Sequence, residues 1–405
     1  MSIDPTENNY HKLVPETELE GRAERLQDQL RRLELDAALL FDPIHMYYFS
    51  GTIQQGVVVL PTVGKPLLCV RRSVERARIE SSLQHILPLS GLSQLNHHLQ
   101  QAGIQTKRMG VMESNIEFSF YKTLSRTLPQ TAFSDISGVV GALRSVKSDY
   151  EVALVRRAGE HHQLVYDLIP TMIHKEMSEW ELGCEIQHAM MRYGYTGMAR
   201  FSNSTMELFL GYISAGDSAN YPTGFMGPGG AVGLCPTVPY VGSKTQIEKN
   251  QPIYIDTGFG YRGYHTDKTR IFSLGSLSDE VLEAHAHCLQ VEEAVRRRLK
   301  PGAIPAEIYA EVMETMVKSQ GFEQHFMGYG TNQVPFLGHG IGLAVDECPV
   351  IAANISTPLQ KNMILAVEPK KALPGIGMVG IENTYLVTEQ GGENLTPGSN
   401  EVVLV

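Results

Sequence analysis

The chain has 405 residues, of which 42% are hydrophobic and 19% charged, so it is long enough for two domains with large buried cores. Its formal net charge of −10 argues against a nucleic-acid-binding surface, and no apolar run approaches the roughly 20 residues that cross a bilayer. The five cysteines are scattered and form no paired motif, which predicts reduced, buried thiols in a cytoplasmic protein. The polar first residues lack the apolar core of a signal peptide.

The first part of the chain alternates helical and strand-type patterns, which is typical of an α/β domain. A surface helix is expected over residues 17–35, where leucines recur at helical spacing. Short apolar runs predict the strands that follow, at residues 36–42, 56–60, 66–70 and 106–112. Residues 44–51 are expected to form a loop, in which His45 or Tyr48 either packs in the core or reaches a neighbouring site.

A domain boundary is expected near residues 143–153, where polar residues interrupt the apolar pattern before a long helix begins. The predicted domains are therefore residues 1–145 and residues 146–405. In the second domain, residues 211–250 are rich in glycine and proline. A simple linker is not expected inside a domain, so this segment is predicted to be a loop over a site.

The second domain repeats an order of two helices and two strands, over residues 150–273 and 278–387. The second helix of the first half is opened by a capping-box pattern, with Ser178 at its start and Glu181 three residues later. The last of these strands is predicted over residues 377–387. This order predicts two similar halves.

Two carboxylates mark the centre of the second domain. Asp256 follows an apolar strand-type run, and Asp267 lies in another run, rich in aromatic and β-branched residues. Glycines at residues 257–263 supply what a chain reversal needs, so a hairpin is expected to bring the two carboxylates side by side. Carboxylates at close range repel unless a proton or a cation lies between them.

Three other residues are candidate partners of such a cation. His339 lies in a glycine-rich strand or turn, Glu368 ends an apolar run and Glu382 interrupts another. Each alone is more simply explained as a strand end that faces water, but acidic residues are rarely buried without a partner. Together with Asp256 and Asp267 they form an oxygen-rich set with one imidazole, which suits two divalent cations, with a transition metal favoured. Such ions activate water and polarise carbonyl groups, which indicates hydrolysis without a side-chain nucleophile.

These residues resemble the motifs of the pita-bread metallohydrolases, which include methionine aminopeptidase, prolidase, aminopeptidase P and creatinase. The motifs are Tyr254-Ile-Asp256-Thr-Gly258, Gly263-Tyr-His-Thr-Asp267-Lys-Thr-Arg270, Gly338-His339-Gly-Ile-Gly-Leu343, Val367-Glu368-Pro369 and Ile381-Glu382-Asn383. The first domain and residues 143–153 resemble the prolidase and creatinase branch. The resemblance implies an α/β two-domain protein. Its N-terminal domain would be creatinase-like α/β, and its C-terminal domain a pita-bread α+β fold with pseudo-two-fold halves.

The resemblance also implies how the site is used. Asp256 would hold one metal ion, His339 and Glu368 the other, and Asp267 and Glu382 would bridge them. A hydroxide bridged by the metals would attack a peptide carbonyl, and Glu368 would move its proton. The ions implied are manganese or cobalt, with zinc or iron as alternatives. A homodimer is implied as well, with the N-terminal domain of one chain near the site of the other.

The accessory histidines of the family are missing from this chain. Thr223, Pro335 and Asp346 stand where they are expected, and Gly380 replaces the arginine usual before the last glutamate motif. These histidines contact the substrate and steady the tetrahedral intermediate, and a lost donor to a developing oxyanion can reduce the rate by about 10² to 10³.

Other residues are candidates to replace these histidines. Thr223, Tyr221 and Asp346 are predicted to contact substrate, with Tyr240 as a further candidate. His265 is predicted as a second catalytic residue, because it lies two residues from Asp267 on the same strand face; the alternative is a hydrogen-bonded strand histidine. Lys370 and Lys371 either pair with a substrate carboxylate or lie on a solvated surface.

Three functions therefore remain open. The first is a metallopeptidase of the Xaa-Pro dipeptidase or aminopeptidase type, which cleaves a small peptide or peptide-like molecule. The second is a metal-dependent hydrolase or lyase that acts on a small non-peptide substrate, as creatinase-type members do. The third is a non-catalytic binding protein, against which the complete ligand set argues, because unpaired buried carboxylates destabilise a fold.

Overall fold

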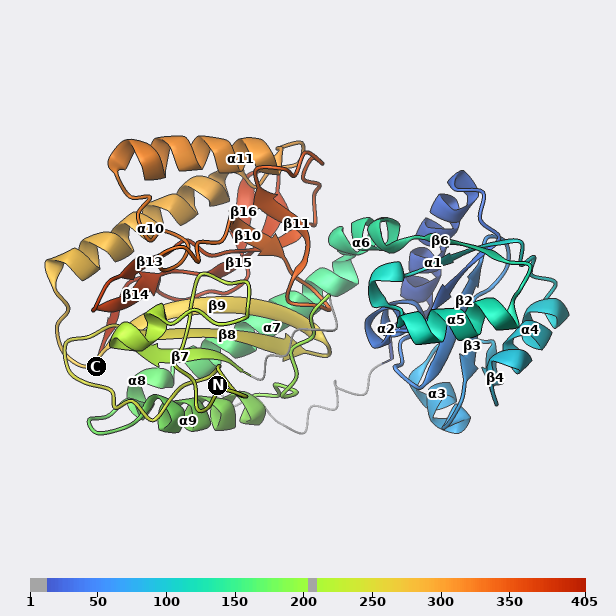
Figure 1. The fold of residues 1–405 in the computed structure, drawn as a ribbon, viewed down its shortest axis with the longest axis horizontal. Coiled ribbons are helices and arrows are strands. Elements are labelled where there is room, and N and C mark those ends of the chain that lie inside the picture. Colours follow the sequence, from blue (N-terminus) through green and yellow to red (C-terminus); the bar gives the residue numbers. More distant parts are fainter. Residues whose placement is uncertain (1–12, 203–209) are drawn as a thin grey trace. The chain divides into compact units, whose positions relative to one another are not determined.

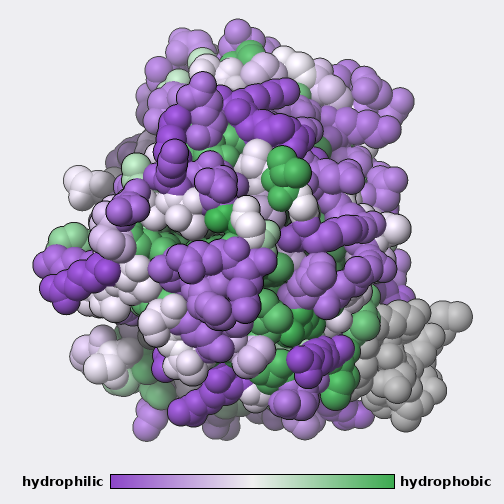
Figure 2. Space-filling model, turned by 90° about the vertical axis from the view of Figure 1, so that its right-hand side faces the viewer, coloured by the Kyte–Doolittle hydropathy of each residue, from purple (hydrophilic) through white to green (hydrophobic). Residues whose placement is uncertain are grey.

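The computed structural model describes residues 13–202 and 210–405, and the polar segment at the N-terminus lies outside them (Figure 1). These residues divide between Arg144 and Ser145 into an N-terminal and a C-terminal unit. Among the described residues, no helix is long and apolar enough to cross a membrane. Figure 2 shows one face of the surface, on which hydrophilic side chains predominate and hydrophobic ones form small, separate groups.

The N-terminal unit is built on a six-stranded mixed sheet with strand order β4-β3-β2-β1-β5-β6. Its strands are β1 (Ala37–Leu40), β2 (Gly56–Pro61), β3 (Leu67–Val70), β4 (Ile86–Pro88), β5 (Arg108–Val111) and β6 (Ala132–Asp135). Its helices are α1 (Glu16–Arg32), α2 (Pro43–Ser50), α3 (Val74–Glu80), α4 (Leu92–Gln101), α5 (Phe118–Thr127) and α6 (Ser137–Ser145), with a 3₁₀ turn, η2 (Glu113–Asn115). Apolar residues of β1, β2, β3 and β5 form a core with α4 and α5, while α1 and α2 pack against β2. The expected α/β domain is therefore present.

The loop expected at residues 44–51 is instead the helix α2. The Asp42 side chain caps this helix by accepting from the His45 backbone N–H, and Gly51 ends it with a left-handed φ of 78°. The His45 ring lies between Asp42 and Arg144, and Tyr48 is buried. Both residues therefore pack within their own unit, which is the simpler of the two alternatives.

The C-terminal unit consists of two halves. The first contains α7 (Asp149–Tyr166), α8 (Ile169–Met172), α9 (Glu179–Arg192), β7 (Gly211–Ala215), η3 (Gly216–Asn220), β8 (Ile253–Tyr261) and β9 (Tyr264–Ser273). The second contains α10 (Asp279–Arg298), α11 (Pro305–Val312), η4 (Met313–Val317), η5 (Lys318–Gln320), β10 (Phe336–Gly340), β11 (Glu347–Ala352), β12 (Ile364–Val367), β13 (Lys370–Leu373), β14 (Gly377–Gly380), β15 (Asn383–Thr388), β16 (Gly391–Asn394) and β17 (Val403–Leu404). Complete capping boxes open α7 and α9, and the second is the one predicted from Ser178 and Glu181.

The strands of this unit lie between two layers of helices (Figure 1). One sheet has the order β17-β9-β8-β7, another β11-β10-β12-β15-β16, and β13 pairs with β14 alone. Helices α7 and α9 cover the first sheet, α10 packs on β13, β14 and β16, and α11 packs on β11. A backbone bridge between Thr269 and Glu382 joins the first two sheets at the point where the candidate ligands meet.

Two further expectations are corrected. The strand predicted over residues 377–387 is interrupted between β14 and β15, and Ile381 and Glu382 form the break. The cysteines are free, as expected, but only Cys69 and Cys288 are buried; the exposed ones are Cys184, Cys235 and Cys348.

Candidate metal centre

The hairpin β8–β9 places Asp256 and Asp267 on one face. The strands continue through the glycines at 258 and 260, and the chain reverses only at Arg262 and Gly263, whose φ angles of 51° and 87° suit a two-residue turn. Asp267 lies opposite Gly258 and Asp256 opposite Thr269, so the two carboxylates are diagonal neighbours. Because Gly258 has no side chain, the space opposite Asp267 stays open.

The other three candidates come from the second half of the unit. His339 lies on β10, Glu368 directly follows β12 and Glu382 directly precedes β15. Because Val367 at the end of β12 pairs with Asn383 at the start of β15, the two glutamates emerge at the same end of the sheet. His339 Nε2 lies 3.5 Å from Glu368 Oε1 and 3.7 Å from Glu382 Oε1. All five predicted ligands line one cavity.

Three of the five residues form a group with metal-ligand geometry. One donor atom each of Asp267, His339 and Glu382 lies within 4.8 Å of the others. Glu382 Oε1 is buried and has no hydrogen-bond partner, which a native carboxylate rarely tolerates. His339 Nδ1 lies 3.1 Å from the Gly340 carbonyl, so Nδ1 donates to it and Nε2 faces the carboxylates. This donor set fits a divalent cation.

A lysine that the sequence did not assign to the site lies among the remaining oxygens. Lys370 Nζ donates to Asp256 Oδ2 at 2.9 Å, to Glu368 Oε2 at 2.8 Å and to Glu382 Oε2 at 2.8 Å. The side chain is fully buried. The expectation of a solvated surface is therefore wrong for Lys370, and its ammonium group is paired with carboxylates of the protein itself. The one signal available was Gly380, which pairs with Lys370 across the β13–β14 hairpin and leaves room for its side chain.

The pKa values of the site residues shift because these groups are buried and close together. Burial, together with the other carboxylates, raises the pKa of Asp256 and raises that of Asp267 well above its usual value. Burial raises the pKa of Glu368 to about 7. Burial would lower the pKa of His339, but Glu382 and Glu368 outweigh it and raise the pKa to about 10. The carboxylates similarly overcome the effect of burial on Lys370 and raise its pKa well above the usual value.

Polar side chains behind the hairpin fix its position. On α7, His162 lies 3.0 Å from Thr257 Oγ1 and 3.2 Å from Thr266 Oγ1. The Tyr166 hydroxyl donates to the Lys268 carbonyl at 2.6 Å. On the site face, the Tyr254 hydroxyl donates to Asp256 Oδ2 at 2.6 Å. These bonds hold the ligands in place from both sides of the sheet.

The carboxylates open into a cavity of about 660 Å³ that is largely apolar. The hydrophobic lining residues are Phe201, Tyr212, Phe225, Met226, Pro335, Phe336, Val345, Val350, Ala352, Ala353 and Ile355. Among the described lining residues, His339 is the only histidine. This cavity has the size and character of a small-molecule binding site.

The predicted substrate-contact residues differ in position. Asp346 lines the cavity, with Oδ1 and Oδ2 accepting from Ser202 N at 2.6 Å and Ser202 Oγ at 2.8 Å. Thr223 Oγ1 lies 2.5 Å from the hydroxyl of Tyr212, which lines the cavity. Tyr221 is 56% exposed and lies outside the lining.

The structure does not bring His265 to the cavity. Its Nδ1 lies 3.1 Å from the Gly342 carbonyl and its Nε2 lies 3.2 Å from the Met198 carbonyl. The ring is buried, and burial lowers its pKa. This geometry matches the alternative of a hydrogen-bonded strand histidine and corrects the prediction of a catalytic one.

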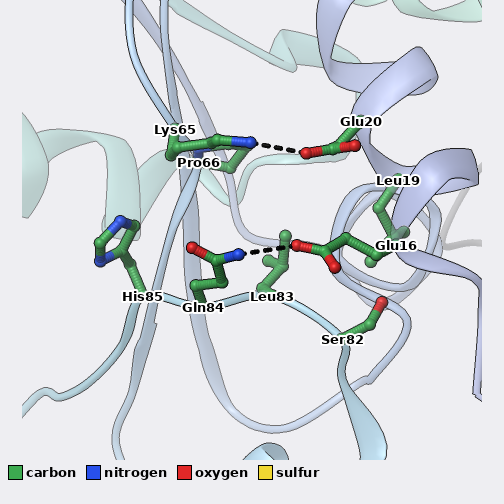
Figure 3. Close-up of a pocket in the computed structure, with 9 residues that line it drawn as sticks. All are labelled: Glu16, Leu19, Glu20, Lys65, Pro66, Ser82, Leu83, Gln84 and His85. Atoms are coloured by element: carbon green, nitrogen blue, oxygen red, sulfur yellow. Dashed lines mark hydrogen bonds and ion pairs between the residues drawn. The ribbon is translucent and has the colours of Figure 1, made fainter.

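The N-terminal unit has a recess that is too small to be an alternative binding site. Figure 3 shows Glu16 and Glu20 of α1 facing Gln84 and Lys65. Gln84 Nε2 donates to Glu16 Oε1 at 2.8 Å, and Lys65 Nζ donates to Glu20 Oε1 at 2.6 Å. The recess between them has a volume of about 20 Å³. That is room for little more than a water molecule.

Comparison with known proteins gives matches along nearly the whole chain. Residues 153–389 match the family described as Metallopeptidase family M24, and residues 22–146 match the Creatinase/Prolidase N-terminal domain. The chain is 24% identical to an Xaa-Pro dipeptidase of Pyrococcus furiosus over 95% of this chain and 100% of that protein. It is 23% identical to an uncharacterised peptidase of Staphylococcus saprophyticus over 93% of this chain and 99% of that protein.

Solved structures share the fold. An X-Pro aminopeptidase of Thermotoga maritima matches with a TM-score of 0.79 at 25% identity, over 95% of this chain and 99% of that chain. An Xaa-Pro dipeptidase of Bacillus anthracis also matches with a TM-score of 0.79, at 24% identity, over 96% of this chain and 100% of that chain. The two-domain α/β architecture predicted from the sequence is confirmed.

Proposed function

The chain belongs to metallopeptidase family M24, and from this premise we propose that it cleaves small peptides or peptide-like molecules in the cavity lined by β8, β9 and β10. The observation that carries the proposal is Glu382 Oε1, which is buried, accepts no hydrogen bond and is grouped with Asp267 and His339 in the lining of a 660 Å³ cavity. A divalent ion bound by such residues lowers the pKa of water and polarises a carbonyl group.

Glu368 is the proposed general base and acid. Its pKa, raised by burial to about 7, lets the carboxylate both accept and return a proton near neutral pH. Oε2 is held by Lys370, so Oε1 is the atom that takes the proton from the attacking water and passes it to the leaving amine. Asp267, His339 and Glu382 would hold the ion, and the apolar walls of the cavity would shield the reaction from bulk water.

The substrate is proposed to carry an apolar group and a cationic one. The apolar walls suit a bulky side chain or a proline ring, and Pro335 adds to them. The Asp346 carboxylate offers a partner for a substrate ammonium, while Thr223 acts indirectly by holding the Tyr212 hydroxyl. The similar Xaa-Pro dipeptidases and X-Pro aminopeptidase support a short peptide.

A second candidate function is hydrolysis of a small non-peptide amide. It is favoured by the described cavity lining, in which no histidine other than His339 is present to steady a tetrahedral intermediate. A panel of Xaa-Pro dipeptides, other dipeptides and cyclic amides distinguishes the two functions. Turnover of dipeptides supports the first, and turnover of cyclic amides alone replaces it with the second.

The role of Glu368 is tested by Glu368→Gln. The amide keeps the shape of the side chain but cannot accept the proton, so kcat is expected to fall by about 10²-fold or more with unchanged far-UV circular dichroism. Glu393→Gln is the control, because Glu393 lies on β16 and is about half exposed beside Arg156. A Glu368→Gln variant as active as Glu393→Gln contradicts the assigned role.

A further inference from the structure

We propose that the Lys370 ammonium occupies one of the two cation positions among these carboxylates, so that this chain holds a single divalent ion. The inference rests on the proposed metal-dependent function and deepens it. Two ions are what the resemblance implies, but the residues present fit only one of the two positions.

The hydrogen bonds of Lys370 use the oxygens that a second ion would need. An ammonium group has three N–H donors, and here each has its own carboxylate acceptor, on Asp256, Glu368 and Glu382, at 2.8 to 2.9 Å. A divalent ion bound by the same oxygens would lie about 2.0–2.2 Å from each of them. The ion and Nζ would then overlap, so the position admits one or the other.

The packing of Lys370 indicates that its side chain is built into the site. The residue is the first of β13 and pairs with Gly380 of β14. A Cβ atom at Gly380 would lie 2.7 Å from Lys370 Cα and 2.9 Å from its Cγ, so the lysine stem runs across the bare glycine. Nζ also lies 5.6 Å from the centre of the Tyr254 ring. A withdrawal of Nζ would break three charge-assisted hydrogen bonds in a buried setting.

The remaining donor atoms form one complete position. Glu382 gives Oε2 to Lys370, and its Oε1 accepts no hydrogen bond and lies 3.7 Å from His339 Nε2. Asp267 completes the group. One divalent ion there, with the ammonium, brings three positive charges against the four carboxylates of the site.

The number of ions is measured on the full chain after reconstitution with manganese and removal of excess metal. Elemental analysis is expected to give one manganese per wild-type chain. Electron paramagnetic resonance is expected to show the signal of an isolated ion, without the spin coupling of a bridged pair. In crystals of this protein, anomalous scattering should place manganese beside His339 and none at Nζ of Lys370.

Lys370→Ala vacates the second position and is expected to bind two manganese ions per chain. Its electron paramagnetic resonance should show the spin coupling of a bridged pair. Lys371→Met is the matched control and should keep a ratio of one, because Lys371 faces away, with Nζ 3.1 Å from the Phe322 carbonyl. If Lys370→Ala does not fold, the wild-type ratio and the anomalous peak still decide the matter.

Other outcomes separate this inference from the proposed function. Two ions per wild-type chain, with peptide hydrolysis, overturn the inference and leave the function standing. A ratio that stays at one in folded Lys370→Ala overturns the inference in the same way. No bound manganese in the wild type overturns both.

Discussion

Glu292 illustrates how single residues behind the site support it. This buried glutamate of α10 accepts a 2.7 Å hydrogen bond from Asn383 Nδ2. Asn383 Oδ1 accepts from Arg270 Nη2 at 2.7 Å, and Arg270 Nη1 donates to the backbone carbonyl of Glu382 at 3.0 Å. The network therefore fixes the backbone that carries a candidate ligand, at the expense of a carboxyl group held away from water.

This carboxyl group makes stability depend on pH. Burial raises the pKa of Glu292 from 4.5 to about 7, so the native state binds the proton more tightly than the unfolded chain. The stability that comes from this bound proton is fully present below pH 4.5 and is lost as the pH rises to about 7. The free energy of unfolding of Glu292→Gln, measured by urea unfolding, should therefore rise by about 3 kcal/mol relative to that of the wild type between these pH values.

Glu293→Gln is the control for this prediction. Glu293 is the half-buried neighbour, and the hydrogen bond from Arg296 lowers its pKa to about 2, so its ionisation in the native state does not change above pH 4.5. The stability of Glu293→Gln relative to the wild type should be the same at pH 5 and pH 8. An equally constant difference for Glu292→Gln would show that Glu292 is ionised in the native state throughout.

At the scale of elements, the β13–β14 hairpin depends on Gly380. The residue has a φ of 145°, and a Cβ atom there would lie 2.4 Å from the Pro369 carbonyl oxygen and 2.7 Å from Lys370 Cα. Gly380→Ala is therefore expected to destabilise the C-terminal unit by roughly 1–3 kcal/mol. The measurement is urea unfolding with a chelator present, so that differences in metal binding do not contribute.

Gly258→Ala is the matched control, because a Cβ atom there meets only the Thr266 carbonyl oxygen, at 3.8 Å. Alanine in a strand is easier to order than glycine, so this variant should unfold at the same or higher urea concentration. Equal destabilisation of both variants would mean that Gly380 is not needed for close packing.

The elements also show what could be predicted from the sequence. A capping box located α9, and strand-type runs located β8 and β9, because hydrogen-bonding side chains and local periodicity fix such elements. The break between β14 and β15 was missed, because the apolar pattern continues through Ile381. The helix α2 was missed as well, because eight mostly apolar and aromatic residues carry no clear helical period.

At the scale of the whole molecule, the sequence predicts the five candidate ligands and the hairpin that brings Asp256 beside Asp267, but not the place of Lys370 among them. Acidic residues that interrupt or end apolar strands can be recognised in the sequence, because charge is not expected in a buried strand. These residues are Asp256, Asp267, Glu368 and Glu382. The place of Lys370 depends on which carboxylates meet when two sheets join at Thr269 and Glu382. The Lys370–Asp256 hydrogen bond joins residues 114 positions apart and the Thr269–Glu382 contact joins residues 113 apart, and no local pattern encodes such contacts.

The candidate metal residues all lie in the C-terminal unit, and so does the only tryptophan of the chain, Trp180 on α9. Fluorescence of Trp180 therefore reports the unfolding of the unit that binds the ion. An ion that binds only the folded state adds about 2.7 kcal/mol at 100 times its dissociation constant. For a unit of this size, chelation should lower the Tm of the fluorescence transition by roughly 5–10 °C.

Asp267→Asn supplies the control for this last prediction. Asparagine keeps the shape of the side chain but removes a charge that the ion needs, so chelator should leave the Tm of this variant unchanged. The N-terminal unit has its own core, formed by strands β1, β2, β3 and β5 with α4 and α5. A transition of that unit, followed by circular dichroism, should therefore not shift. If elemental analysis shows that the ion has left the wild type and the Trp180 transition stays in place, the ion does not hold the two halves of the C-terminal unit together.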